Sequence, residues 1–328
     1  MVQRVEQAKE NEKIRRSMSA AADKGFIIDP KTGVKYTKIA AFRGKNDVIE
    51  LTNQLNLSPN GKFLLSECDV VPLDDNEAFE LDDGHATRAS WSPDGQKIAF
   101  YSRGAICMVP VSQETGRPTG PVRKLLGGGY KWHTRVSWSP DSEKLVFIRM
   151  PDEEKGIHGG DIWTVSVKDG SLRQITRDDA REEAPVWSPD GKTIAYVKRK
   201  GRHFNLWLVS AEGGEPRKII EAGGRLFRIF PYWSPNGKWI LYNLGRKLYL
   251  FDIYNNRELE ITPPVRAVGD FFSFSPDGKK ILFYRTSYDY IDGLKVVSAS
   301  GGLPLDVAGQ IQCYGKPRWS SDSKTLAV

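Results

Sequence analysis

The amino-acid sequence predicts an all-β fold, a β-propeller of seven four-stranded antiparallel blades. The first observation is a five-residue phrase, Trp-Ser-Pro-Asp-Gly, which stands at 91–95 and 187–191 and recurs in degenerate form along the chain. The second is its spacing, because successive copies are 34 to 49 residues apart, a period typical of repeat architectures. The third is that the copies are followed by short apolar runs. The seven copies lie at 57–61, 91–95, 138–142, 187–191, 233–237, 274–278 and 319–323.

Each copy predicts a tight hairpin turn between the first and second strands of a blade. In the copy at 187–191, Pro189 presets the backbone for the first central turn position and Asp190 suits the second. Gly191 takes the following left-handed position, which a β-carbon would penalise. The tryptophans of the repeated phrase are expected in the core.

The apolar runs after each turn supply the remaining strands of a blade. Second strands are expected at 97–101, 144–148, 193–197, 239–242 and 280–284. Third strands are expected at 105–111, 161–167, 205–211, 247–253 and 294–299, and fourth strands at 122–126, 172–176, 216–220, 258–262 and 304–308. Four short antiparallel strands per repeat make one propeller blade.

The two ends of the chain are expected to share the last blade. Residues 316–328 supply only two strands and their turn, and two further strands are expected at 36–42 and 47–52. Two strands from each end would complete a blade and remove the free sheet edges. A chain truncated inside a longer array is the alternative, and six blades instead of seven stays open.

The segments at 91–100 and 187–196 resemble the repeat of the TolB-type (WD40-like) β-propeller family. The hallmark of that repeat is the Trp-Ser-Pro-Asp-Gly hairpin followed by Lys, an aliphatic residue, Ala and an aromatic residue. The resemblance covers roughly residues 34–328 and implies the fold. It leaves function open, because related repeats occur in TolB, a periplasmic protein-binding subunit, and in the propeller domains of prolyl oligopeptidase-like peptidases.

The sequence divides into residues 1–33, an N-terminal charged helix or linker, and residues 34–328, the propeller. Residues 1–24 favour a helix but carry too few apolar residues for a convincing buried stripe. A surface helix or linker remnant is one interpretation and a docking helix is the other. The segment lacks the apolar core of a secretory signal, so we expect a cytoplasmic protein, or an exported one if the start lies upstream.

The motif search gives no catalytic constellation. We find no glycine-flanked nucleophile serine, no His-Glu-x-x-His and no phosphate-binding glycine pattern, and we therefore expect no enzyme and no cofactor. The three cysteines have the unrelated spacings of buried structural thiols: Cys68, Cys107 and Cys313. No metal site is expected, although the histidines could converge across the central channel: His85, His133, His158 and His203.

The predicted topology gives the propeller two unequal faces. The first-to-second and third-to-fourth connections share a face of tight turns, which we call the turn face. The second-to-third connections and the links between blades share the other, the long-loop face, where binding residues are expected. We count about six positive charges in excess on the long-loop face, out of the net charge of +7 for the whole chain.

Cations and aromatic residues on the long-loop face are the candidate binding site. The candidates are Arg88, Lys131, Trp132, His133, Arg135, Arg181, Arg225, Arg228, Tyr314, Lys316 and Arg318. Arginines there could pair with carboxylates in bidentate fashion, and the aromatic rings could supply flat contact surface.

Two function classes follow from the sequence. The first is a non-catalytic, monomeric scaffold that binds a protein partner or an anionic ligand through its basic long-loop face. Nucleic acid is an unlikely partner, since acidic residues interrupt the basic ones, and no membrane insertion is expected. The alternative is a propeller-type hydrolase or lyase, or the accessory propeller domain of a peptidase-like enzyme.

Overall fold

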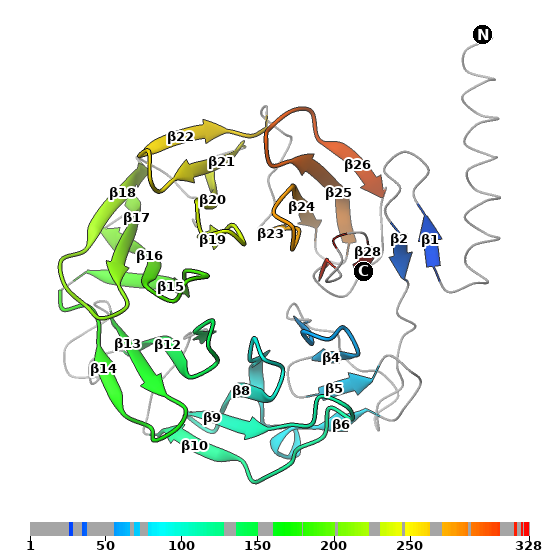
Figure 1. Ribbon diagram of the computed structural model, residues 1–328, viewed down its shortest axis with the longest axis vertical. Coiled ribbons are helices and arrows are strands. Elements are labelled where there is room, and N and C mark those ends of the chain that lie inside the picture. The colour runs from blue at the N-terminus through cyan, green and yellow to red at the C-terminus, as the bar shows by residue number, and fades with distance from the viewer. Residues whose placement is uncertain are drawn as a thin grey trace.

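The computed structural model confirms the β-propeller. It describes residues 26–28, 35–37, 56–65, 69–72, 78–127, 136–149, 160–178, 180–200, 203–222, 230–244, 247–262, 271–287, 290–308, 318–319, 323 and 325–327. Six four-stranded antiparallel blades follow one another around a ring, and a further four-stranded sheet is formed by strands from both ends of the chain (Figure 1).

Each of the six blades is built from one continuous segment. The first blade comprises β3 (Asn56–Leu57), β4 (Phe63–Leu65), β5 (Asp69–Pro72) and β6 (Phe79–Glu80), and the second comprises β7 (Thr87–Trp91), β8 (Lys97–Ser102), β9 (Ala105–Pro110) and β10 (Arg123–Leu126). The third comprises β11 (Ser137–Trp138), β12 (Lys144–Arg149), β13 (Asp161–Ser166) and β14 (Leu172–Gln174), and the fourth comprises β15 (Arg181–Trp187), β16 (Thr193–Lys200), β17 (His203–Ser210) and β18 (Arg217–Ala222).

The last two of these blades repeat the pattern. The fifth comprises β19 (Tyr232–Trp233), β20 (Trp239–Leu244), β21 (Lys247–Asp252) and β22 (Arg257–Glu260), and the sixth comprises β23 (Phe271–Phe274), β24 (Lys280–Ser287), β25 (Tyr290–Ser298) and β26 (Leu305–Ala308). In every blade the strand that carries the repeated phrase lies innermost in the ring (Figure 1).

The hairpin turns form for the reasons that the sequence suggests. In the fourth blade, the Gly191 N–H donates to the Ser188 carbonyl at 2.9 Å, and Gly191 has a φ of 71°. The Ser188 hydroxyl donates to Asp190 Oδ1 at 2.6 Å and accepts the Thr193 N–H at 2.9 Å. The same serine bonds recur in all six blades, and each of the six serines is buried.

Two turns carry serine where the others carry glycine. Ser142 and Ser323 both have a φ of 61°, in the left-handed region that disfavours a β-carbon. Each hydroxyl compensates by accepting a backbone N–H from the preceding blade, Ser142 from Asp94 and Ser323 from Asp277, both at 3.0 Å. The two copies of the phrase that end in serine therefore join neighbouring blades.

The hydrophobic core is divided among the boundaries between blades. Within the described residues, five clusters lie between successive pairs of the six blades. Trp91, Trp138 and Trp187 are each 8% exposed and belong to three of these clusters. The second strands carry apolar side chains on both faces, and packing each blade between two neighbours buries both of these faces.

The closing sheet differs from the prediction. Its order is β1 (Phe26–Ile28), β2 (Lys35–Thr37), β28 (Thr325–Ala327) and β27 (Arg318–Trp319), so two strands do come from each end. However, β1 lies before the predicted strand at 36–42, and the predicted strand at 47–52 lies outside the described residues. The β1–β2 hairpin places its second strand next to β28, and these two strands pair in parallel.

This arrangement brings both ends of the described chain to one side of the propeller. β28 is the second strand of its blade and runs toward the long-loop face. β2 runs the same way and β1 the opposite way, so the chain enters β1 and leaves β28 on the long-loop face.

Several other expectations concern residues outside this description. Residues 1–24 are among them, so the N-terminal helix and the domain division at 33 and 34 stay predictions, as do Cys68 and Cys313. Cys107 is a buried free thiol, as expected. The one helical turn among the described residues is a 3-10 turn at Asp82–Gly84, and none of their helices is long and apolar enough to cross a membrane.

Candidate functional site at the blade boundaries

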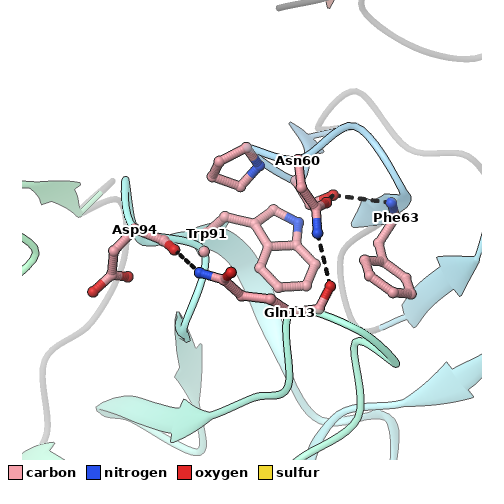
Figure 2. Close-up of a pocket in the computed structure, with 8 residues that line it drawn as sticks. Asn60, Phe63, Trp91, Asp94 and Gln113 are labelled. Carbon is pink, nitrogen blue, oxygen red and sulfur yellow. Dashed lines mark hydrogen bonds between the residues drawn. The ribbon is translucent and has the colours of Figure 1, made fainter.

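A pocket lies on the turn face between the first and second blades, and Figure 2 shows it in close-up. The pocket encloses about 250 Å³ and is lined by Ser58, Pro59, Asn60, Phe63, Trp91, Asp94, Gly95 and Gln113. It forms because the connection between β9 and β10 is longer than the other third-to-fourth turns and folds back over the blade boundary.

The polar groups of this pocket are used to join the blades. The Asn60 side-chain amide donates to the Gln113 carbonyl at 2.7 Å, and the Gln113 amide donates to the Asp94 carbonyl (Figure 2). The pocket is also smaller than most small-molecule sites. We therefore interpret it as a structural contact between the first two blades.

A β-bulge shapes the long-loop end of the innermost strands. In β15 the pairing register shifts between Glu183 and Val186, and in β7 between Thr87 and Ser90. Ala184 and Arg88, each three residues before its tryptophan, have φ values of 52° and 54°. Bulges of this kind bend a strand and redirect its side chains, often beside functional sites.

Beyond the bulge in β15, polar side chains gather at the boundary between the third and fourth blades. We call this group the Glu182 cluster: Asp161, Thr176, Asp178, Glu182 and Lys198. Asp161 begins β13, Thr176 follows β14, Asp178 lies in the link between the blades, Glu182 lies in β15 and Lys198 in β16. All five positions lie on the long-loop side of the third and fourth blades.

Glu182 reaches across the boundary and is fully buried. Its side chain has an exposed fraction of 0%, and its Oε2 accepts the Ile162 N–H at 3.1 Å and the Thr176 hydroxyl at 2.5 Å, both from the third blade. Its Oε1 has no hydrogen-bond donor and lies 4.0 Å from the Lys198 ammonium.

Lys198 is held by other groups as well. Its ammonium contacts the Asp178 carboxylate and lies 4.5 Å from the centre of the Trp207 ring, a cation–π contact. The Asp178 N–H donates to Asp161 Oδ1 at 3.2 Å, and Gln174 donates to Asp161 Oδ2 at 2.8 Å. The link between the blades is thus tied to both of them.

The electrostatics of the cluster are unusual for a surface loop. Burial, reinforced by Asp178 and Asp161, raises the pKa of Glu182 to about 7, although the Thr176 hydrogen bond and Lys198 oppose the shift. Burial also raises the pKa of Asp161. A carboxyl group with a pKa near neutrality can hold or release a proton under physiological conditions, which marks a functional-site candidate.

The second blade shows what the same boundary looks like without this carboxyl group. Alignment on Trp91 and Trp187 places Ala86 at the position of Glu182, and Ala86 is 1% exposed. Ser102 stands at the position of Lys198 and donates to the Asp82 carboxylate, which matches Asp178. Relative to the second blade, the fourth blade thus carries a carboxylic acid in place of Ala86 and a lysine in place of Ser102.

Of the candidate residues from the sequence, the structure describes few. Arg88 lies in the bulge of β7, and Arg181 begins β15 and pairs through Nε with Glu183 Oε1 at 2.8 Å. Arg318 is the first residue of β27. The other candidates lie outside the described residues: Lys131, Trp132, His133, Arg135, Arg225, Arg228, Tyr314 and Lys316.

Sequence reasoning did not single out Glu182. It was one of several acidic residues in the links between blades, and nothing in composition separates a buried carboxyl group from an exposed one. An alignment of the repeats on tryptophan could have found it, because it places a carboxylic acid opposite Ala86. The described residues contain no group of three or more His, Cys, Asp or Glu side chains arranged to hold a metal ion.

The chain is similar in sequence to a protein that is named a peptidase. Over 178 residues the chain is 32% identical to "Uncharacterized peptidase YuxL" of Bacillus subtilis, a match that covers 53% of this chain and 26% of that protein. The chain therefore spans about a quarter of the length of this curated relative.

Solved structures of similar fold include other enzymes. A structure described as an oligogalacturonate lyase in complex with manganese shares 17% identity, with a TM-score of 0.68 over 92% of this chain and 91% of that one. A puromycin-hydrolyzing peptidase from Mycobacterium tuberculosis shares 15% identity, with a TM-score of 0.57 over 79% of this chain and 46% of that one. At these identities the likeness shows the fold.

The matches bear on two expectations from the sequence, the absence of enzymatic function and the resemblance to the TolB-type family. The expectation that the chain is not an enzyme is wrong, because the relative that shares 32% identity over 178 residues is named a peptidase. This match favours the alternative drawn from the sequence over the binding scaffold. The expected resemblance is confirmed by the family model of the TolB beta propeller domain, which matches residues 134–323. Since this match covers more than half of the 328 residues, the chain belongs to the TolB β-propeller family.

Proposed function

We propose that this chain is the propeller domain of a peptidase-like enzyme and that its long-loop face is turned toward the catalytic part. The observation that carries the proposal is the 32% identity to a peptidase over 178 residues, a match that covers about half of this chain and about a quarter of the peptidase. The two proteins would then share propeller blades, and the rest of the peptidase would contain its catalytic part.

The topology of the closing sheet supports the choice of face. The chain enters β1 and leaves β28 on the long-loop side, so a domain attached at either end would be attached there. The same side carries Arg88, Arg181 and the Glu182 cluster. Arginines at this position would contact an acidic segment of a peptide or of the catalytic domain, and we keep the other cationic and aromatic candidates as part of that proposed surface.

The test is an activity measurement on the natural protein, purified from its own cells by a tag at the chromosomal locus. We expect hydrolysis of aminoacyl and short peptidyl chromogenic substrates that co-purifies with this chain and is blocked by a serine-directed fluorophosphonate. Absence of both hydrolysis and a labelled polypeptide would contradict the proposal.

The similarity of fold to the lyase over nine-tenths of both chains defines a second assay on the same preparation. Cleavage of oligogalacturonate, followed by the ultraviolet absorbance of the unsaturated product, would replace the peptidase proposal with a lyase one.

The proposed face has its own test in a pair of charge reversals. Arg181→Glu should weaken hydrolysis of acidic peptides more than of neutral ones, because it replaces a cation at the long-loop face. Lys238→Glu is the matched control, since Lys238 is an exposed residue of a hairpin turn on the opposite face. Equal effects of the two reversals would argue against the assignment of the face.

A further inference from the structure

Lys198 lies between two carboxylates, one on the link and one inside the blade boundary. Its ammonium contacts Asp178 and lies 4.0 Å from Glu182 Oε1, and its side chain is 16% exposed against 0% for Glu182. Asp178 belongs to the link between the third and fourth blades, whereas Glu182 lies inside the boundary. The position of one side chain therefore connects the interior to the long-loop face.

The two oxygens of Glu182 are not equivalent. Oε2 accepts both hydrogen bonds, from the Ile162 N–H and the Thr176 hydroxyl, and Oε1 accepts none. A proton on Oε1 would leave a neutral acid whose other oxygen is fully satisfied. Loss of that proton places a charge on a fully buried side chain, which is costly unless a cation moves closer.

The surroundings of Glu182 contain one cation in contact range and two other acids. The groups that act on Glu182 are Asp161 from β13, Thr176 after β14, Asp178 from the link, and Tyr196 and Lys198 from β16. Around them, Gln174 and Arg177 act on Asp161, and the Trp207 ring contacts Lys198. Arg181 and Glu183 pair with each other at 2.8 Å. Two carboxyl groups, Asp178 and Glu182, thus share one lysine, Arg177 acts on Asp161, and burial favours the proton on Glu182.

We propose that Glu182 and Lys198 form a proton-operated latch on the link between the third and fourth blades. With Glu182 neutral, Lys198 stays with Asp178 and the link is fastened to the propeller. When Glu182 loses its proton, Lys198 turns inward to the buried carboxylate and Asp178 loses its ammonium partner. The proton goes to solvent, and nothing else is exchanged. The inference stands on these contacts and does not depend on the proposed enzymatic function.

The amides of the link report the state of the latch. The Asp178 N–H donates to Asp161 and the Ala180 N–H donates to Asp178 Oδ1 at 2.8 Å, so both are protected while the link is fastened. The second blade offers an internal reference, because there Ser102 and Ala86 replace the lysine and the acid.

The experiment is hydrogen exchange with mass spectrometry on the purified chain at pH 6 and pH 8, with each rate divided by the intrinsic rate at that pH. In the wild-type protein, protection of the peptide that contains Asp178 and Ala180 should fall by roughly two- to fivefold at pH 8, the range expected when an exposed ion pair is lost. In Glu182→Gln, which keeps the neutral form, protection should be the same at both pH values. In Lys198→Met it should be low at both.

Glu183→Gln is the matched control, because it removes the neighbouring carboxylate and should leave the pH response intact. An identical pH response in wild type and Glu182→Gln would overturn the latch, and so would a response that Glu183→Gln abolishes. If Glu182→Gln fails to fold, the carbon-13 titration of the Glu182 carboxyl in the wild-type protein decides. A midpoint below pH 5 would overturn the proposal, and one near 7 together with the loss of protection would support it.

Discussion

Some side chains at the hairpin turns also form hydrogen bonds to the neighbouring blade, and Ser142 is an example. Ser142 accepts a left-handed backbone, which costs about 1 kcal/mol or more for a residue with a β-carbon. It regains stability through the hydrogen bond from the Asp94 N–H of the neighbouring blade. A glycine here would relax the backbone but could not reach across the boundary.

The balance of these two effects gives a prediction for Ser142. Ser142→Ala should lower the free energy of unfolding by about 1 kcal/mol, because it loses the hydrogen bond and keeps the strained φ. Ser142→Gly should cost less, since it loses the bond but relieves the strain. Urea denaturation of both variants checks this, and a glycine variant less stable than the alanine variant would contradict it.

Glu182 should make the stability of the chain depend on pH. Its pKa of about 7 in the folded protein exceeds the ordinary glutamate value of 4.5, so the folded state binds more protons between these values. The stabilisation is complete below pH 4.5 and is lost as the pH rises through 7. At about 1.4 kcal/mol per pKa unit, a rise from 4.5 to about 7 corresponds to a loss of roughly 3.5 kcal/mol.

Glu182→Gln should remove this dependence. The variant should match the wild type near pH 5 and exceed it in stability by roughly 1 to 3 kcal/mol at pH 8, because only the wild type must bury a charge. Denaturation midpoints of both proteins at the two pH values make the comparison. A wild type that is more stable than the variant at pH 8 would show that ionised Glu182 is well compensated.

At the scale of the element, the hairpin turn is the unit that the sequence specifies best. The turn depends on local residue types, so Pro189, Asp190 and Gly191 predict it without knowledge of the rest of the chain. The strands after the turns were predicted well for the same reason. The closing strands were not, because β1 and β2 pair with the other end of the chain and no repeated phrase marks them.

The Glu182 cluster was beyond sequence reasoning for a related reason. Its contacts join residues of three strands, the segment after β14 and one link, and burial is set by the neighbouring blade. A single carboxylate in a charged stretch gives no sign of this. The bulge in β15 was also missed, since Ala184 is not a residue type that indicates a positive φ.

The turn assignment itself can be tested in the fourth blade. Gly191→Val should destabilise the chain by roughly 1 to 3 kcal/mol, because a β-branched residue would have to adopt a φ of 71°. Lys192→Ala should change stability by well under about 1 kcal/mol, since that side chain is exposed. Equal thermal midpoints would mean that the glycine is not required by the turn.

At the scale of the whole molecule, arginines on the outer strands fasten the second to fifth blades to one another. Arg123 donates to the carbonyls of Val167 and Lys168 at 3.2 and 3.0 Å. Arg173 donates to the Glu212 carbonyl at 2.7 Å and contacts its carboxylate, and Arg217 donates to Asn256 at 3.3 Å. Each of these arginines lies at the start of a fourth strand, so the contact repeats from the second blade to the fifth.

In the closing sheet, the chain enters β1 and leaves β28 on the same face of the propeller. Joining these two ends should therefore preserve the ring, so that the chain could be opened at another link. Phe26 pairs with Thr37 and Thr37 with Ala327, so Phe26 and Ala327 are separated by two strand spacings, about 10 Å. A flexible linker of about four residues would span that gap.

A circular permutant that joins Phe26 to Ala327 and opens the chain in the link between the second and third blades should fold with an unchanged circular dichroism spectrum. A permutant that is folded only when opened elsewhere would show that this link is needed for assembly.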